Sequence, residues 1–385
     1  MDSRIRDLLN RQNVTIVYSG TRISGGEKTG EPCITVGVIK KYTPVQLQAL
    51  NLEPIPANIM GLETDVVETH VLSAPPSLIL STQPSDDPRT HQQKFRPTVP
   101  GGVSAIVCGS TACTTTLWVW SDALKKPVLL QNWHCEELNA CDKHLIIQQS
   151  PYDGGKTPDD AIARFLAGNI ENTKTDSAVS EGGYWGVGEK FVPSDEFATQ
   201  DIFGLGSYHG IDEVKVGDHV VKSGRTTGIT EGDVQAIDGA ANIQYPDKVR
   251  QKEDLIVTSN MLQGGDSSSP MKLFNNREIG LGFAGQGFGG SDLMSVFIKP
   301  KNILEDPAFA SLSLNFDYDF GPIIPPPPVP EPPPTPDPNV CLLNCIAQWD
   351  GQDTTTLISC FMNCLSSSGV KKRTVMDAIY NKLEL

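Results

Sequence analysis

The central part of the chain, residues 101–310, is a succession of short apolar runs separated by glycine and other turn residues. Runs such as "TTTLWVW", "DHVVKSG" and "DLIVTSN" are rich in β-branched and aromatic residues. None has the length and period of a helix of three turns. Closely spaced strands of this kind are typical of an all-β sandwich or a pair of barrels. Glycines inside the strands favour two barrels, because glycine permits sharp strand bends.

Residues 1–72 have a different pattern. "NVTIVYSG", "CITVGVIKKY" and "TDVVETHV" are strand-like. "TPVQLQALN" predicts a short helix with Thr43 as its N-cap and Pro44 at its first position. We therefore expect a small α/β domain over residues 1–72. Residues 73–100 are rich in proline and predict a linker or strap, and the double barrel is expected over residues 101–315.

Residues 316–338 predict a spacer. Within it, "PIIPPPPVPEPPPTPDP" contains eleven prolines in 17 residues. This composition favours polyproline II, on the order of 50 Å long. Such segments also serve as ligands of proline-binding modules, although a spacer is the commoner use. The abrupt change of composition at Pro322 suggests attachment to a protein partner or to another copy of the same chain.

Residues 339–385 contain four cysteines in two pairs of the same spacing. Residues four apart on a helix share one face. Two helices joined through "WDGQDTTT" would form a hairpin with Cys341 bridged to Cys364 and Cys345 bridged to Cys360. Free thiols and a four-cysteine zinc site are alternatives that the spacing leaves open.

Composition argues against several classes of protein. The net charge of −15 argues against a nucleic-acid binder, which needs a basic surface to neutralise phosphates. No run of about 18 apolar residues is present, so we expect no membrane span. The N-terminal "MDSRIRDLLNRQ" has no apolar signal core, which favours the cytoplasm but leaves the compartment open.

The stretch "QGGDSSSPM" at residues 263–271 places three serines behind an aspartate and two glycines. One interpretation is a polar turn between two strands, because glycine, aspartate, serine and proline are all turn residues. The other is a nucleophilic serine at Ser267. That second interpretation requires a base, an orienting acid and donors for an oxyanion.

Residues of these types occur in a suitable order. His134 ends the apolar run "PVLLQNW", where a barrel would present a side chain at its rim; a structural histidine at a strand end is the alternative. Asp176 precedes small and apolar residues in "NTKTDSAV", as expected of a half-buried carboxylate that orients an imidazole. Gly265 lies two residues before Ser267, so that their N–H groups can point into one oxyanion pocket.

These motifs resemble those of chymotrypsin-fold serine proteases. "GDSSSP" is similar to the nucleophile motif "GDSGGP" of that family, "NWHC" to its histidine motif "AAHC", and "TDSA" to the motif around its aspartate. "VGDHVVKSGRTTGIT", "SPYDGGKTPDDAI" and "GLGFAG" resemble the trypsin-like branch found in bacteria, fungi and plants without zymogen activation. The likeness covers about residues 14 to 310.

The resemblance implies two six-stranded antiparallel β-barrels and a serine endopeptidase that needs no cofactor. Ser267 would attack the peptide bond of a protein or peptide substrate and form an acyl-enzyme. His134 would act as general base and then as acid, and Asp176 would orient His134. The N–H groups of Gly265 and Ser267 would form the oxyanion hole. A catalytically silent binding or structural protein on the same fold, or an esterase with the same triad, is the alternative.

Other residues follow from the same resemblance. Phe283, Ala284 and Gly285 would form the strand that pairs with the substrate backbone. Ser268 and Ser269 stand where the family usually has two glycines, which narrows the φ/ψ tolerance of the turn.

The resemblance also bears on activation and on disulfides. "RPTVPGGVSA" stands where an activation start such as "IVGG" would be, so Asp266 gains no new α-amino group to pair with, and we expect a competent enzyme without cleavage. "KSGRTTG" is interpreted as a structural turn. Cys135 would form a bridge to Cys113 or Cys108, or remain a free thiol.

Overall fold

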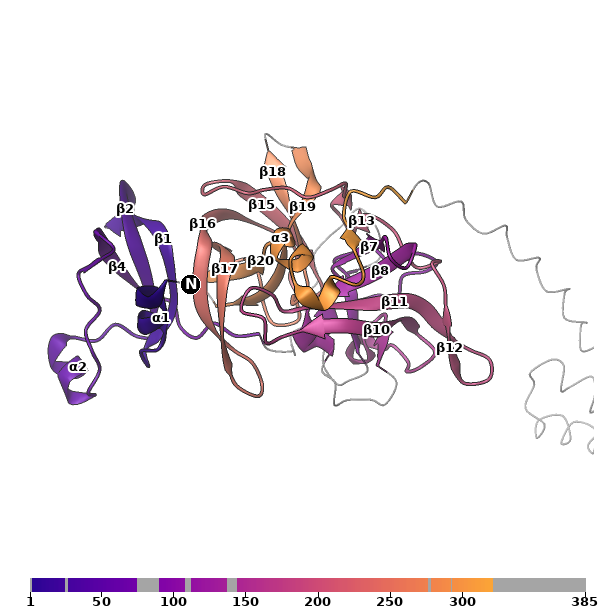
Figure 1. The fold of residues 1–385 in the computed structure, drawn as a ribbon, viewed down its shortest axis with the longest axis horizontal. Helices are drawn as coiled ribbons and strands as arrows, with labels where there is room; N and C mark the ends of the chain where they lie inside the picture. Colours follow the sequence, from indigo (N-terminus) through magenta and orange to yellow (C-terminus); the bar gives the residue numbers. More distant parts are fainter. Residues whose placement is uncertain are drawn as a thin grey trace, which may run out of the picture. The chain divides into compact units, whose positions relative to one another are not determined.

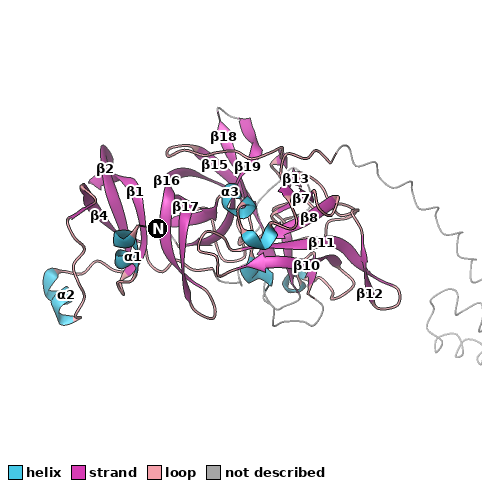
Figure 2. Ribbon diagram, viewed as in Figure 1, coloured by secondary structure: helices cyan, strands magenta, loops and turns pink. Residues whose placement is uncertain are grey.

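The computed structural model describes residues 2–24, 27–74, 90–107, 112–136, 144–275, 278–291 and 293–320. Strands dominate, and the few helices are short (Figure 2). The helices are α1 (Ser3–Leu9), α2 (Pro44–Ala49) and α3 (Pro300–Leu304), with 3-10 turns η1 (Trp133–Glu136), η2 (Pro151–Asp153) and η3 (Pro307–Phe309). The expected proline-rich spacer and cysteine hairpin, from residue 322 onward, lie outside the described residues.

The larger sheet has ten strands in the order β15-β18-β19-β20-β17-β16-β1-β2-β4-β3. β15 also pairs with β16, so the first six strands of this order form a ring of pairings. The strands are β1 (Val14–Ser24), β2 (Glu27–Val38), β3 (Asn58–Ile59), β4 (Leu62–Glu68), β15 (His219–Gly224), β16 (Gly228–Gln244), β17 (Val249–Ser259), β18 (Pro270–Asn275), β19 (Glu278–Gly290) and β20 (Met294–Ile298).

The second sheet has nine strands, in the order β21-β7-β8-β11-β10-β9-β5-β6 with β12 paired to β11. They are β5 (Ser104–Val107), β6 (Cys113–Thr114), β7 (Leu117–Ser121), β8 (Lys126–Gln131), β9 (Leu145–Ile147), β10 (Ala161–Asn169), β11 (Ser177–Gly186), β12 (Lys190–Pro193) and β21 (Leu314–Asn315). β13 (Asp201–Ile202) and β14 (Gly206–Ser207) form a separate pair.

The expectation of two six-stranded antiparallel barrels holds only in part: the fold is mainly β, but the two sheets are not two closed barrels. Among the described residues, no pairing joins the two ends of the nine-stranded sheet. The ten-stranded sheet extends beyond its ring because β1 pairs with the outer part of β16, Val17 opposite Ala240. Figure 1 shows β1 beside β16. An unpaired strand edge offers free N–H and C=O groups, and β1 satisfies those of β16.

The N-terminal elements form as their local sequence indicates. The predicted helix α2 begins at Pro44, and Thr43 and Gln46 form a reciprocal capping box, which confirms the N-cap. Leu8 and Leu9 of α1 are buried in an apolar cluster with side chains of β1 and β2 and with Ala240. Residues 1–321 form one compact unit.

One apolar cluster joins the two sheets. It contains Val119 and Leu130 from the nine-stranded sheet and Val257 and Val296 from the larger one, all completely buried. The candidate site lies at strand ends and turns of these two sheets, after β8 and before β11. No helix among the described residues is long and apolar enough to cross a bilayer.

Candidate active site

The structure brings the predicted base and acid together. His134 lies in η1 just after β8, and Asp176 directly precedes β11. Because β8 and β11 pair, with Gln131 opposite Ala178, the two residues meet at neighbouring strand ends. His134 Nδ1 is 2.6 Å from Asp176 Oδ2, and the backbone N–H of His134 donates to Asp176 Oδ1 at 3.1 Å. A carboxylate acceptor places the proton on Nδ1 and leaves Nε2 as the basic nitrogen.

The surroundings of Asp176 keep it ionised. Burial by itself would raise the pKa of Asp176, but the facing His134 and the nearby Lys252 outweigh this, and the pKa lies below its usual value. Burial also lowers the pKa of Lys252 to about 8. The ammonium of Lys252 secures the loop before Asp176, since it donates to the carbonyls of Ile170, Asn172 and Thr175 at 2.6, 2.8 and 2.6 Å.

Tyr245 is a site residue that the sequence analysis missed. It lies in the turn between β16 and β17, and its hydroxyl donates to Asp176 Oδ2 at 3.0 Å. Its ring meets the His134 ring edge-on, with centroids 5.7 Å apart. Burial and the charge of Asp176 raise the pKa of Tyr245 well above its usual value, so it remains a donor. The local sequence "IQYPDKV" indicates only a strand end and a turn.

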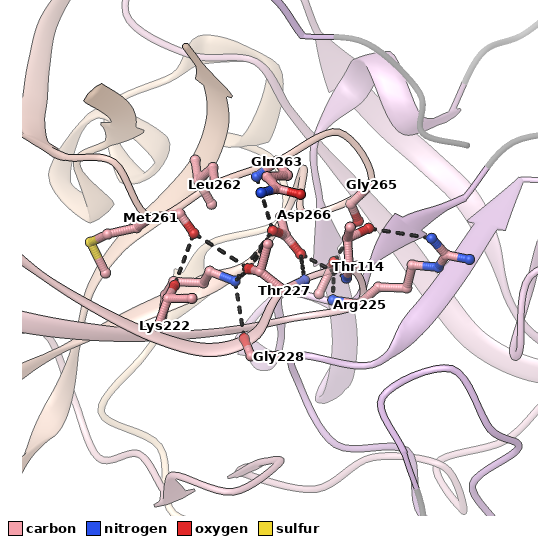
Figure 3. A network of polar contacts seen from close by, with 12 residues as sticks. Thr114, Lys222, Arg225, Thr227, Gly228, Met261, Leu262, Gln263, Gly265 and Asp266 are labelled. Carbon is pink, nitrogen blue, oxygen red and sulfur yellow. Dashed lines mark hydrogen bonds and ion pairs between the residues drawn. The ribbon is translucent and has the colours of Figure 1, made fainter. Parts of the chain in front are cut away.

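Asp266, one residue before the predicted nucleophile, is completely buried. It lies within a network of polar contacts (Figure 3) and has five donors around it. Its Oδ1 accepts from the backbone N–H groups of Thr226 and Thr227 at 2.8 and 3.1 Å. Its Oδ2 accepts from the Thr227 hydroxyl at 2.6 Å and from the Gln263 N–H at 3.0 Å. Lys222 Nζ lies 3.3 Å from Oδ2. All these donors except Gln263 belong to the "KSGRTTG" segment.

Lys222 supplies a cation that the sequence analysis did not foresee. The side chain is fully buried, and burial lowers its pKa while Asp266 offsets part of that shift. We expected Asp266 to have no α-amino group as a partner, and a lysine ammonium stands beside it instead. The turn that carries Ser267 is thus held by contacts within the chain.

The backbone around Ser267 is compatible with an oxyanion hole. Gly265 has a φ of +92°, in the left-handed region that favours glycine. The N–H groups of Gly265 and Ser267 donate to no acceptor within the described part of the chain. Both donors therefore remain able to bind an oxyanion.

Ser267 and His134 are not hydrogen bonded to each other. His134 Nε2 is buried and has no hydrogen-bond partner among the described residues. Ser267 is 6 % exposed and lines a cavity of about 380 Å³. Catalytic hydrogen bonds are often long in free enzymes and tighten when substrate binds.

The predicted substrate-binding residues belong to the same strand as part of the cavity lining. Phe283, Ala284 and Gly285 are in β19, where Gly285 is opposite Met271. The backbone of Gly287 instead bonds to the nucleophile turn, accepting from Ser268 N–H and donating to Ser269 O. The part of β19 that lines the cavity is its end, Phe288, Gly289 and Gly290.

Ser268 connects the two halves of the site. Its φ is +77°, and its hydroxyl accepts from the backbone N–H of Asn132 at 2.7 Å. Asn132 lies two residues before His134, so this bond ties the nucleophile turn to the histidine segment. A glycine at this position could not make it. Ser269 is also buried, and its hydroxyl has no partner among the described residues.

A disulfide lies beside His134. Cys135 is bonded to Cys113, one of the two partners considered, and Cys108 lies outside the described residues. Sulfur and nitrogen atoms of Cys113, His134 and Cys135 lie within 4.8 Å of one another, a spacing found among metal ligands. The disulfide, however, uses both thiols, and a metal such as zinc binds the thiolate form.

Comparisons with known proteins find similarity in three-dimensional structure but none in sequence. No protein-family model matches the sequence, and no curated protein matches it. A glutamic acid-specific serine protease aligns with 54% of this chain and 96% of its own, at 19% identity and a TM-score of 0.38. Nocardiopsis protease aligns with 57% of this chain and 100% of its own, at 16% sequence identity and a TM-score of 0.39. Cellulomonas bogoriensis chymotrypsin aligns with 57% of this chain and 98% of its own, at 19% sequence identity and a TM-score of 0.37. The likeness carries no inference about activity.

Two substitutions at Ser268 should separate its hydrogen bond from its backbone conformation. Ser268→Ala keeps the left-handed φ and leaves the buried Asn132 N–H unpaired, so the free energy of unfolding should fall by about 1–3 kcal/mol. Ser268→Gly loses the same hydrogen bond, but glycine adopts the left-handed φ without steric strain, which returns about 1 kcal/mol of the free energy of unfolding. Urea unfolding should therefore rank the serine protein first, glycine second and alanine last. A glycine variant less stable than the alanine variant would contradict this account.

Removing Lys222 should cost more than removing another buried lysine. Lys222→Met leaves the Asp266 carboxylate without its cation and should lower the free energy of unfolding by about 3–5 kcal/mol. Lys272 is a matched control, because its ammonium is also buried but donates to the carbonyls of Leu205 and Ser207. Lys272→Met should cost about 1–3 kcal/mol. Equal losses in denaturant unfolding would argue against a special role for Lys222.

Proposed function

We propose that the protein is a trypsin-like serine endopeptidase that hydrolyses peptide bonds of protein substrates through His134, Asp176 and Ser267. The observation that carries the proposal is the short contact between His134 Nδ1 and the buried, ionised Asp176. This contact fixes the tautomer in which Nε2 is a base. Such a base requires a nucleophile and donors for an oxyanion. Ser267 lies in a turn held by the contacts of Asp266, and the N–H groups of Gly265 and Ser267 are two such donors.

The proposed reaction has two steps, acylation of Ser267 and hydrolysis of the acyl-enzyme. Ser267 Oγ attacks the peptide carbonyl while its proton moves to His134 Nε2. Asp176 stabilises the resulting imidazolium, and the N–H groups of Gly265 and Ser267 bind the oxyanion. His134 then gives its proton to the leaving amine, which departs and leaves an ester on Ser267. Water, deprotonated by His134, hydrolyses this ester and regenerates the serine.

A small fluorophosphonate probe tests the nucleophile directly. The unmodified protein should be labelled on Ser267, Ser267→Ala should lose labelling completely, and Ser268→Ala should retain it. Loss of a triad serine typically lowers the rate by a factor on the order of 10⁴–10⁶, so the contrast is unambiguous. Absence of labelling in the unmodified protein would favour a catalytically silent protein on this fold. If Ser267 is labelled, comparing turnover of peptide and short-chain ester substrates would separate an endopeptidase from an esterase.

Tyr245 should affect turnover through Asp176. Tyr245→Phe removes a hydrogen bond to an ionised group, so kcat on a peptide substrate should fall by about tenfold or more, with little change in KM. Tyr208→Phe is the matched control, since the Tyr208 hydroxyl is equally buried but donates to the carbonyl of Trp118. The control should lose stability and keep its kcat. A similar kcat in both variants would show that Tyr245 has only a structural role.

A further inference from the structure

Residues 70–74 form a short segment that follows β4 and lies against the end of β19. We call it the strap. The N–H of Ser73 donates to the carbonyl of Gly290, and the N–H of Gly290 donates to the carbonyl of Ser73, both at 3.2 Å. This reciprocal pair is the bonding pattern of antiparallel strands. The strap therefore occupies the backbone groups of Gly290 on the side away from β20.

The strap is also bonded to β16. Gln244, the last residue of β16, donates its N–H to the carbonyl of Leu72 at 2.9 Å and accepts from the N–H of Ala74 at 3.0 Å. The strap thus fills the space between the ends of β16 and β19 as an additional short strand. Four backbone hydrogen bonds hold it there.

Side chains of the strap alternate between an anchored face and a cavity face. Leu72 and Ala74 are completely buried, in the apolar cluster that also contains Tyr245 and Phe288. Ser73 is only half-buried and lines the same cavity of about 380 Å³ as Ser267. The strap therefore packs into the apolar core through Leu72 and Ala74, and through Ser73 it borders the cavity that contains Ser267.

An extended peptide binds a sheet edge by pairing its backbone with the free N–H and C=O groups of that edge. Phe288, Gly289 and Gly290 are the part of β19 beside the Ser267 cavity, and they offer such an edge. Gly290 cannot pair with a peptide while both of its groups bond to Ser73. A peptide that reaches Ser267 along this edge must first displace the strap.

We propose that the strap is an autoinhibitory strand, held in the peptide-binding edge next to Ser267 by the chain itself. Protein substrates bind in extended form only in the state in which the strap has left β19. The population of that state sets the apparent activity, since a fractionally populated competent state lowers apparent affinity in proportion. This inference deepens the proposed function and rests on it.

Two substitutions at one position test the strap. Ser73→Pro removes the N–H that donates to Gly290, whereas Ser73→Ala keeps it and changes only the side chain. We expect Ser73→Pro to cleave fluorescein-labelled casein about tenfold faster than the unmodified protein, the factor that one backbone hydrogen bond is worth. Ser73→Ala should cleave casein at the unmodified rate. A small fluorophosphonate, which needs no strand edge, should label all three proteins alike.

Equal casein cleavage by the two variants, with labelling intact, would overturn the strap and leave the proposed function standing. Absence of both labelling and cleavage in all three proteins would instead count against the proposed function. Hydrogen exchange at the Gly290 amide then decides the strap without any catalysis. That amide should exchange faster in Ser73→Pro than in Ser73→Ala, and equal protection in both would overturn the proposal.

Discussion

The candidate site depends on one buried carboxylate. Asp266 is removed from water, and an ionised group in that position must find donors on every side. β15 supplies the ammonium of Lys222, and the segment after β15 supplies two backbone N–H groups and a hydroxyl. These contacts fix the turn that follows, and the turn places the Ser268 hydroxyl against Asn132 N–H. His134 follows two residues later, so the contacts of Asp266 indirectly help to position His134.

The residues that could be predicted are those with a local signature. The strand-end His134, the aspartate of "TDSA" and the glycine-rich serine turn are each readable within a few residues, as is the capping box at Thr43. Tyr245 and Asp176 are 69 residues apart in sequence and meet where the apolar cluster joins the two sheets. No pattern along the chain marks that contact. Whether Ser267 and His134 are hydrogen bonded depends on side-chain orientation, which sequence does not specify.

Register determines which part of β19 lines the Ser267 cavity. "GLGFAGQGFGG" contains two similar units, Phe-Ala-Gly at 283–285 and Phe-Gly-Gly at 288–290. Both fit a glycine-rich edge, and the pairing of Gly287 with the nucleophile turn selects the second. Strand periodicity likewise predicted β1, β2 and β4 but not their union with β16. The alternation of apolar and polar residues along one strand predicts the strand but not its partner, because strand pairing depends on tertiary packing.

The pairing of β1 with β16 gives the N-terminal strands a protective role. Val17 and Ile16 cover the outer edge of β16, where they pair with Ala240 and Ala241. If residues 1–72 were removed, that edge would present unpaired N–H and C=O groups over an apolar surface. Such an edge is a template for association with another chain. The N-terminal strands thus cover an edge of the long β16–β17 hairpin that would be unpaired without them.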